Sequence, residues 1–238
     1  PDVQALLRQM LEAGNRSCVM EVSSHALVQQ RVAGLKFDVA VFTNLTRDHL
    51  DYHGSMAAYG AAKAMLFAND LSNTAVVNVS DEFGRSLAAQ CQTPLLVYGK
   101  AEDCRSYPRF LAYSEVIALA DGYRFRLHTE QGDFSLQLPL LGEFNIQNVL
   151  AAISAMLVLG YPLSAVLAVL DKLTAVPGRM ELFHFPQDFS AVIDYAHTPD
   201  ALQQALQSLR LHCRGRLWCV FGCGGDRDRG KRPVMGQL

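Results

Sequence analysis

The first hundred residues switch repeatedly between helical and strand spacing of their apolar positions. Apolar side chains at helical spacing before Gly14 predict a first helix; they are Val3, Leu6, Leu7, Met10 and Leu11. Short apolar runs predict buried strands, and several are followed by a Ser or Asp that can cap a helix. The predicted strands are 17–22, 37–42, 74–79 and 95–98, and the predicted helices begin near Ser24, Ser55 and Asp81. This alternation predicts a mainly parallel sheet with helices on both faces.

The pattern changes between residues 111 and 138, where apolar and polar residues alternate. The pairs Asp121-Gly122 and Gly132-Asp133 are typical of hairpin turns, so we predict an antiparallel addition to the sheet. Two helices are then expected at 145–159 and 163–172.

A linker is predicted at 174–178, where Thr-Ala-Val-Pro-Gly interrupts the periodic pattern. Beyond it we expect a strand at 191–193, a helix at 199–211 with Pro in its first turn, and a strand at 217–221. The predicted domains are therefore 1–175 and 178–238. The fold class is α/β: a three-layer domain around a mainly parallel sheet with an antiparallel addition, followed by the start of a second, Rossmann-like domain.

Composition narrows the classes of protein. Half of the 238 residues are hydrophobic, 18% are charged and the net charge is −2, which suits a sizeable core and disfavours a nucleic-acid partner. No apolar run is long enough to span a membrane, and no signal-peptide pattern opens the chain, so we expect a cytoplasmic protein. The six cysteines form no C-x-x-C pair, and we expect reduced, buried thiols. Because Pro1 and Leu238 both fall in predicted helices, we expect a piece of a longer protein.

Glu21 and His49 follow two of the predicted strands. The carboxyl ends of parallel strands meet at one edge of a sheet, where ligands bind, and a carboxylate and an imidazole both suit a divalent cation. The alternative without a metal ion is that Glu21 caps a helix and that His49 is a hydrogen-bonded histidine of the core. Lys63 lies on the next helix, where an ammonium with a pKa near ~10.4 would repel a metal ion, so an exposed lysine is its default interpretation.

Two further groups carry weaker signals. Asp48, Asp51 and His53 gather around His49, with His25 upstream, as in a hydrolase metal site, but no second histidine-rich segment completes a ligand set. The glycine-rich run 222–229 follows a predicted strand and could bind a carboxylate or phosphate, although it is neither G-x-G-x-x-G nor a Walker A sequence. Such a run often serves only to turn the chain.

Several segments closely resemble the Mur ligase family, in the order in which that family has them. They are Met-Glu-Val-Ser-Ser-His-Ala-Leu at 20–27, Thr-Asn-Leu-Thr-Arg-Asp-His-Leu-Asp-Tyr-His-Gly at 43–54, Ala-Lys at 62–63, Leu-Gly-Glu-Phe-Asn-Ile-Gln-Asn at 141–148, Pro-Gly-Arg-Met-Glu at 177–181, Asp-Tyr-Ala-His-Thr-Pro-Asp at 194–200 and Phe-Gly-Cys-Gly-Gly-Asp-Arg-Asp at 221–228. The last run resembles the diaminopimelate-adding type more than the lysine-adding type. The resemblance covers essentially the whole chain.

The resemblance implies an ATP-dependent ligase of peptidoglycan precursor synthesis, which adds meso-diaminopimelate to UDP-N-acetylmuramoyl-L-alanyl-D-glutamate through an acyl phosphate. It implies Mg²⁺ and a lysine carbamylated by carbon dioxide, in a cytoplasmic monomer. The matching positions are Glu21 and His49 for magnesium, Lys63 for the carbamate, Ser23, Gln29 and Arg31 for the UDP-muramoyl dipeptide, Asn145, Asn148, Arg179, Asp194 and His197 for the nucleotide, and Arg227 for the diaminopimelate carboxylate. A carbamate would turn the repelling ammonium of Lys63 into an anionic oxygen ligand.

The family's phosphate-binding Gly-x-x-Gly-Lys-Thr segment and its uridine-docking domain are expected upstream of Pro1, and its Asp-Asn-Pro-Arg segment downstream of Leu238. We therefore expect almost no ligase activity from these residues alone. A folylpolyglutamate synthase is the second enzyme hypothesis, against which Gln29 and Arg31 argue. A non-catalytic nucleotide-sugar binding module is the third.

Overall fold

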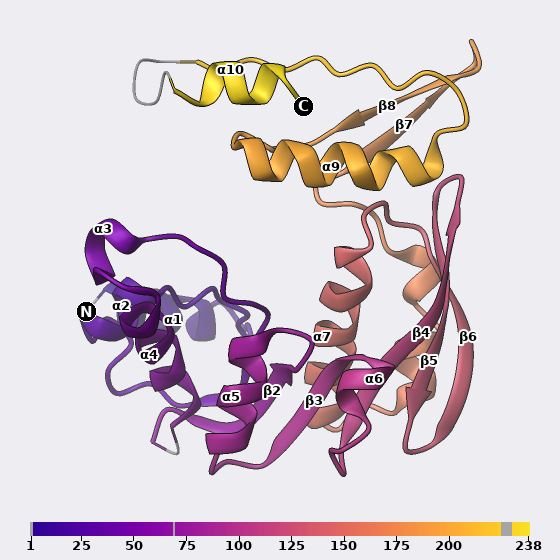
Figure 1. Ribbon diagram of the computed structural model, residues 1–238. Coiled ribbons are helices and arrows are strands. Elements are labelled where there is room, and N and C mark those ends of the chain that lie inside the picture. The colour runs from indigo at the N-terminus through magenta and orange to yellow at the C-terminus, as the bar shows by residue number, and fades with distance from the viewer. Residues whose placement is uncertain (1, 69, 225–229) are drawn as a thin grey trace.

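The computed structural model describes residues 2–68, 70–224 and 230–238, and its first part is built around a six-stranded sheet. The strands lie side by side in chain order, with β1 to β4 parallel and β4 to β6 antiparallel, as Figure 1 shows. They are β1 (Phe37–Phe42), β2 (Ser72–Asn78), β3 (Leu95–Lys100), β4 (Phe110–Leu119), β5 (Gly122–Thr129) and β6 (Gly132–Leu138). The predicted parallel sheet with an antiparallel addition is confirmed.

Helices cover both faces of this sheet, because side chains of successive strand residues point to opposite faces. Val76 packs with Ile146 in one core cluster, whereas its neighbours Ala75 and Val77 pack with Leu87 in the other. The first face carries α7 (Phe144–Val158), α8 (Leu163–Leu167) and the 3-10 turn η2 (Leu170–Lys172); the second carries α5 (Glu82–Gln90), α6 (Ala101–Cys104) and η1 (Met65–Phe67). The three-layer prediction is confirmed.

Four helices lie around the start of the chain, and side-chain caps fix where two of them begin. They are α1 (Asp2–Glu12), α2 (Ser24–Val28), α3 (Leu50–His53) and α4 (Met56–Ala64). Oγ of Ser23 accepts a hydrogen bond from the amide of Ala26 (3.1 Å), and Oγ of Ser55 accepts one from Ala58 (3.2 Å). These bonds satisfy amides that the first turn of a helix leaves unpaired.

The C-terminal part consists of the hairpin β7 (Glu181–Phe185) and β8 (Phe189–Ile193), with α9 (Pro199–His212) and α10 (Lys231–Gly236). It joins the first part through an apolar contact among Leu141, Met180 and Ala205. In addition, Nδ1 of His212 lies 2.6 Å from the carbonyl oxygen of Leu119, at the end of β4. Figure 1 shows α9 lying across this end of the first sheet.

Two predicted strands are wrong. Residues 17–22 and 217–221 have no strand pairing, and Val19 and Val220, one in each run, are fully exposed. An apolar run favours burial, but only hydrogen bonds to a neighbouring strand make a strand of it. The strand β7 was not predicted. It pairs with β8 across the turn at 186–188, and this partner lies outside the short run of residues that forms β7.

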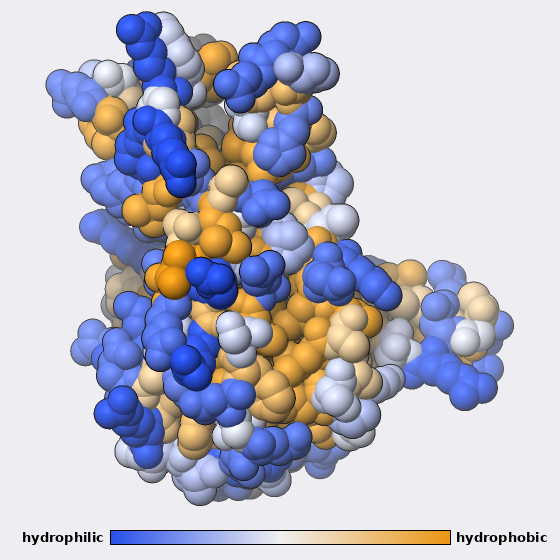
Figure 2. Space-filling view, turned by 90° about the vertical axis from the view of Figure 1, so that its right-hand side faces the viewer, coloured by the Kyte–Doolittle hydropathy of each residue, from blue (hydrophilic) through white to orange (hydrophobic). Residues whose placement is uncertain are grey.

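The exposure of the cysteines differs from the prediction that their thiols are buried. All six are free, but Cys18 and Cys219 are exposed, and only Cys104 is buried; burial raises the pKa of its thiol to about 12. Figure 2 shows the β6 side of the molecule, where apolar side chains gather in the middle of the lower part and polar side chains surround them. Among the described residues, no helix is long and apolar enough to cross a membrane.

Candidate active site

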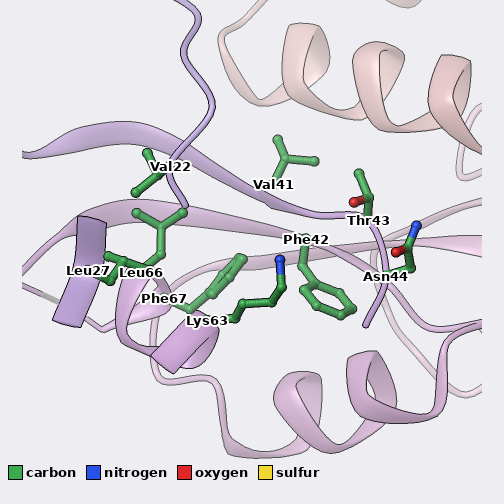
Figure 3. Close-up of a pocket in the computed structure, with 9 residues that line it drawn as sticks. All are labelled: Val22, Leu27, Val41, Phe42, Thr43, Asn44, Lys63, Leu66 and Phe67. Atoms are coloured by element: carbon green, nitrogen blue, oxygen red, sulfur yellow. The ribbon is translucent and has the colours of Figure 1, made fainter. Parts of the chain in front are cut away.

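A small cavity of about 60 Å³ opens where β1 ends and α4 passes it. Lys63 enters this cavity from α4, and Figure 3 shows its amine reaching between the rings of Phe42 and Phe67. The lining comes from four segments, and its residues are Val22, Leu27, Val41, Phe42, Thr43, Asn44, Lys63, Leu66 and Phe67. The amine of Lys63 therefore lies at the carboxyl end of β1, in largely apolar company.

Imidazole and phenol rings gather next to this cavity. The rings of His25 and His49 meet edge to face at 5.0 Å, and His25 lies 5.3 Å from His53. The buried ring of Tyr59 joins them to the lysine: its centroid is 5.8 Å from the ring of His49, and Nζ of Lys63 lies 5.1 Å from it. The structure therefore brings His49 and Lys63 to the same aromatic ring.

His49 sits in a strained backbone conformation. Its φ of 54° is left-handed, which is uncommon for a residue other than glycine. The side chain of Asp48 offsets part of this cost, because its Oδ1 accepts the amide of His49 at 2.7 Å. Strain of this kind clusters at functional sites, where the surrounding structure holds it in place.

The predicted magnesium ligands are only partly brought together. Glu21 is exposed on the segment before α2, and its neighbour Val22 lines the same cavity as Lys63. No group of three or more His, Cys, Asp or Glu side chains in residues 2–68, 70–224 and 230–238 is placed to hold a metal ion. The third ligand of the predicted set would be an oxygen of a carbamate on Lys63. The donor chemistry of Glu21, His49 and a lysine carbamate fits a hard divalent cation, whereas an ammonium does not.

The three predicted dipeptide-binding residues all belong to α2 and its end. Ser23 caps the helix, and Gln29 ends it, with Nε2 donating to the hydroxyl of Tyr52 at 3.2 Å. Arg31 is exposed two residues further on. Because the side chains of Gln29 and Arg31 both reach solvent, they are available to a ligand.

His53 has a perturbed proton affinity within the ring cluster. The pKa of His53 is lowered, first because the imidazole loses solvent and then because His25 and His49 disfavour a further positive charge. Its Nε2 lies 2.9 Å from Oγ of Ser24. The unfolded chain therefore takes up this proton at a higher pH than the folded chain does.

The free energy of unfolding is expected to fall as the pH drops below about 6.5, because protons then bind preferentially to the unfolded chain. Urea unfolding between pH 8 and pH 5 measures this slope. His53→Gln, which keeps a hydrogen-bonding group near Ser24, is expected to flatten it, and His184→Gln on the exposed hairpin is expected to leave it unchanged. Equal slopes in the wild type and His53→Gln would contradict the assignment.

The predicted nucleotide contacts form a second group around the start of α7 and the C-terminal part. Nδ2 of Asn148 donates to Oδ1 of Asn145 (3.0 Å), and Nδ2 of Asn145 donates to the carbonyl of Leu141 (2.7 Å). The guanidinium of Arg179 lies 4.7 Å from the ring centroid of Tyr195. This stacking holds Arg179 beside the loop that follows β8.

Asp194 and His197 are held in that loop by backbone contacts. The carboxylate of Asp194 accepts the amides of Met180 (3.0 Å) and Ala196 (2.9 Å). Nδ1 of His197 lies 3.2 Å from the carbonyl of Tyr195. Asp194 thus ties this loop to Met180, which packs against Leu141 near the start of α7. Arg227 lies outside the described residues.

The family assignment comes from the sequence profiles. The Mur ligase middle domain profile matches residues 1–156, and the Mur ligase, glutamate ligase domain profile matches residues 178–238. The chain belongs to the Mur ligase family. Its two matched parts correspond to the six-stranded part and the C-terminal part described above.

Two curated relatives and one solved structure share a ligase name. The chain is 52% identical over 233 residues to the UDP-N-acetylmuramoyl-L-alanyl-D-glutamate--2,6-diaminopimelate ligase of Ectopseudomonas mendocina, covering 98% of this chain and 47% of that protein. It is 51% identical over 236 residues to the same-named ligase of Pseudomonas syringae pv. tomato, covering 99% and 48%. A solved structure with that ligase name is 40% identical, with a TM-score of 0.73 over 91% of this chain and 44% of the other. The chain thus spans about half the length of these relatives.

Sequence reasoning missed two residues of this site. Tyr59 lies four residues before Lys63 on α4, so the helical spacing could have placed both on one face. Asn78 is buried at the end of β2 and bonds to the segment after β1. A polar residue closing a strongly apolar strand was the available signal for it.

Proposed function

We propose that this Mur ligase chain is the catalytic middle of an ATP-dependent ligase that joins meso-diaminopimelate to UDP-N-acetylmuramoyl-L-alanyl-D-glutamate. The supporting observation is the meeting of His49 and Lys63 at Tyr59, beside a cavity that Val22 also lines. About 50% identity to ligases named for this reaction supports the choice of substrates. We place the domain boundary at 176–177, inside the linker, and propose that the protein works as a cytoplasmic monomer.

The cavity side of the site would hold the acceptor. Ser23 and Gln29 at the two ends of α2, and Arg31 just beyond it, would bind the UDP-muramoyl dipeptide, with the Arg31 guanidinium matching a carboxylate or phosphate. Glu21, His49 and carbamylated Lys63 would hold Mg²⁺. When bound, Mg²⁺ supplies positive charge that screens the acceptor carboxylate from the phosphates of ATP. Arg227 would bind the carboxylate of the incoming diaminopimelate.

The other side would hold the nucleotide. Asn145 and Asn148 offer amides at the start of α7, and Arg179, Asp194 and His197 face it from the C-terminal part. In the proposed reaction the acceptor carboxylate attacks the γ-phosphorus and ADP leaves; the amine of diaminopimelate then attacks the acyl carbon, and phosphate leaves. These residues would fix the two reactants in line, which is a large part of the rate advantage in such reactions.

The proposal is tested with two proteins: residues 1–238 alone, and the same residues with the coding sequence on either side, which we call the full-length protein. We expect the full-length protein to release phosphate only when the UDP-muramoyl dipeptide, ATP and meso-diaminopimelate are all present. Residues 1–238 alone are expected to show almost none. Turnover with a folate and glutamate in place of these substrates would overturn the proposal and favour a folylpolyglutamate synthase. Binding of the dipeptide without any turnover by the full-length protein would favour a non-catalytic module.

A further inference from the structure

Asn78 is a polar side chain buried at the carboxyl end of β2, with 3% of its surface exposed. Its Nδ2 donates to the carbonyl oxygen of Thr43 (2.8 Å) and to Oε1 of Gln147 (2.9 Å), and its Oδ1 accepts the amide of Ser80 (3.0 Å). These three hydrogen bonds join Asn78 to Thr43, Gln147 and Ser80 in one network, and loss of the buried Asn78 amide would leave all three without this partner.

One end of this network fixes the chain where it leaves β1. Three backbone groups within residues 42–45 are held by side chains from other strands and loops. Tyr98 donates its hydroxyl to the carbonyl of Phe42 (3.0 Å), Asn78 holds the carbonyl of Thr43, and Oδ2 of Asp81 accepts the amide of Leu45 (3.1 Å). This segment lines the cavity of Lys63 and leads on to His49.

The other end of the network is the first turn of α7. Gln147 lies between the two proposed nucleotide contacts, Asn145 and Asn148, and its Nε2 donates to the hydroxyl of Tyr113 at 3.2 Å. Asn78 therefore links two segments, one at Thr43 and one at Gln147, that belong to the two sides of the proposed site.

We propose that Asn78 is a positioning residue for ligation: through Gln147 it holds the 43–48 segment, with His49 at its end, at a fixed place relative to the nucleotide-contacting turn of α7. This proposal rests on the proposed function. Asn78 touches no reacting atom itself. Its effect comes from the sensitivity of two bound reactants to displacements of about 1 Å.

Amide hydrogen exchange in the ligand-free full-length protein tests the structural half. Asn78→Leu keeps the branching and the number of side-chain heavy atoms but removes all three hydrogen bonds, and we expect exchange at residues 43–49 to rise about tenfold, as loss of a net hydrogen bond predicts. The control is Leu138→Ala, a buried substitution on β6, at the opposite edge of the sheet from β1. Each of the two variants is measured at a urea concentration that lies the same amount below its own unfolding midpoint. Equal exchange at 43–49 in both variants would overturn the proposal.

Kinetics test the functional half with a second variant at Gln147. Gln147→Met removes the acceptor for Asn78. We expect the Mg²⁺ concentration for half-maximal turnover to rise about tenfold in Asn78→Leu and Gln147→Met, and to stay near wild type in Leu138→Ala. Equal values in all three variants would overturn the proposal. A wild-type protein without diaminopimelate-dependent turnover would overturn the proposed function instead, and hydrogen exchange would still decide whether Asn78 holds this segment.

Discussion

Lys63→Ala in the full-length protein is expected to lower kcat about 100-fold or more. If Lys63 carries a carbamate, the substitution removes an oxygen ligand of the proposed magnesium ion, and loss of even outer partners of a metal site costs about 10–100-fold. The carbamate forms when the lysine nitrogen attacks carbon dioxide and loses a proton. Phosphate release at saturating substrates measures the effect, with Lys172→Ala, an exposed lysine after α8, as the matched control.

Added carboxylates and bicarbonate test the carbamate on Lys63 in a second way. Acetate or propionate could place a carboxylate in the space that Lys63→Ala leaves in the cavity, and we expect either to restore part of the activity. Bicarbonate is expected to raise the activity of wild-type protein that has been depleted of carbon dioxide, and to have no effect on Lys63→Ala. Activity of Lys63→Ala within threefold of the wild type would contradict the assigned role.

Gly84→Ala is expected to lower the free energy of unfolding by about 3 kcal/mol, the upper end of what overpacking costs. A Cβ at Gly84 would lie 1.8 Å from the carbonyl oxygen of Asn78 and 3.1 Å from the ring of Phe42. Because the first of these is backbone, α5 would have to move away from β2. In an exposed helix, Gly→Ala would raise the free energy of unfolding by about 1 kcal/mol. The close contact with the carbonyl oxygen of Asn78 therefore decides the sign of the effect at Gly84.

Urea unfolding of the 238-residue chain measures this effect. Gly215→Ala is the matched control, because no atom lies within 4 Å of a Cβ built there. The control is expected to change the free energy of unfolding by no more than about 0.5 kcal/mol. A Gly84→Ala protein that unfolds at the urea concentration of the wild type would show that α5 and β2 can separate at little cost.

Much of the fold could be predicted because its signals are local. Ser55 and Asp81 cap the helices that they were predicted to cap, and β1 has the predicted bounds of 37–42. The antiparallel addition was recognisable from Asp121-Gly122 and Gly132-Asp133, although the second turn lies two residues earlier, at Glu130 and Gln131. The caps and the hairpin turns could be predicted because neighbouring residues both carry the pattern and make the hydrogen bonds, whereas β1 also needs its partner β2.

For the candidate site, the sequence predicted which residues take part but not how they are arranged in space. The resemblance assigned roles to Glu21, His49 and Lys63, and the structure brings the last two to Tyr59. It leaves Glu21 exposed on a segment that forms no strand. That segment fails the prediction because its apolar residues, unlike those of β1, have no neighbouring strand to pair with.

The sequence by itself determined the family of this protein, the α/β alternation and the residues that carry charge or a metal-binding atom, since these depend on residue type and short spacing. Only the tertiary structure decided which of them meet: the ring of Tyr59 between His49 and Lys63, and the amide of Asn78 between Thr43 and Gln147. The physical reason is that burial and hydrogen bonding depend on partners far along the chain, and the order of residues does not specify those partners until the sheet has formed.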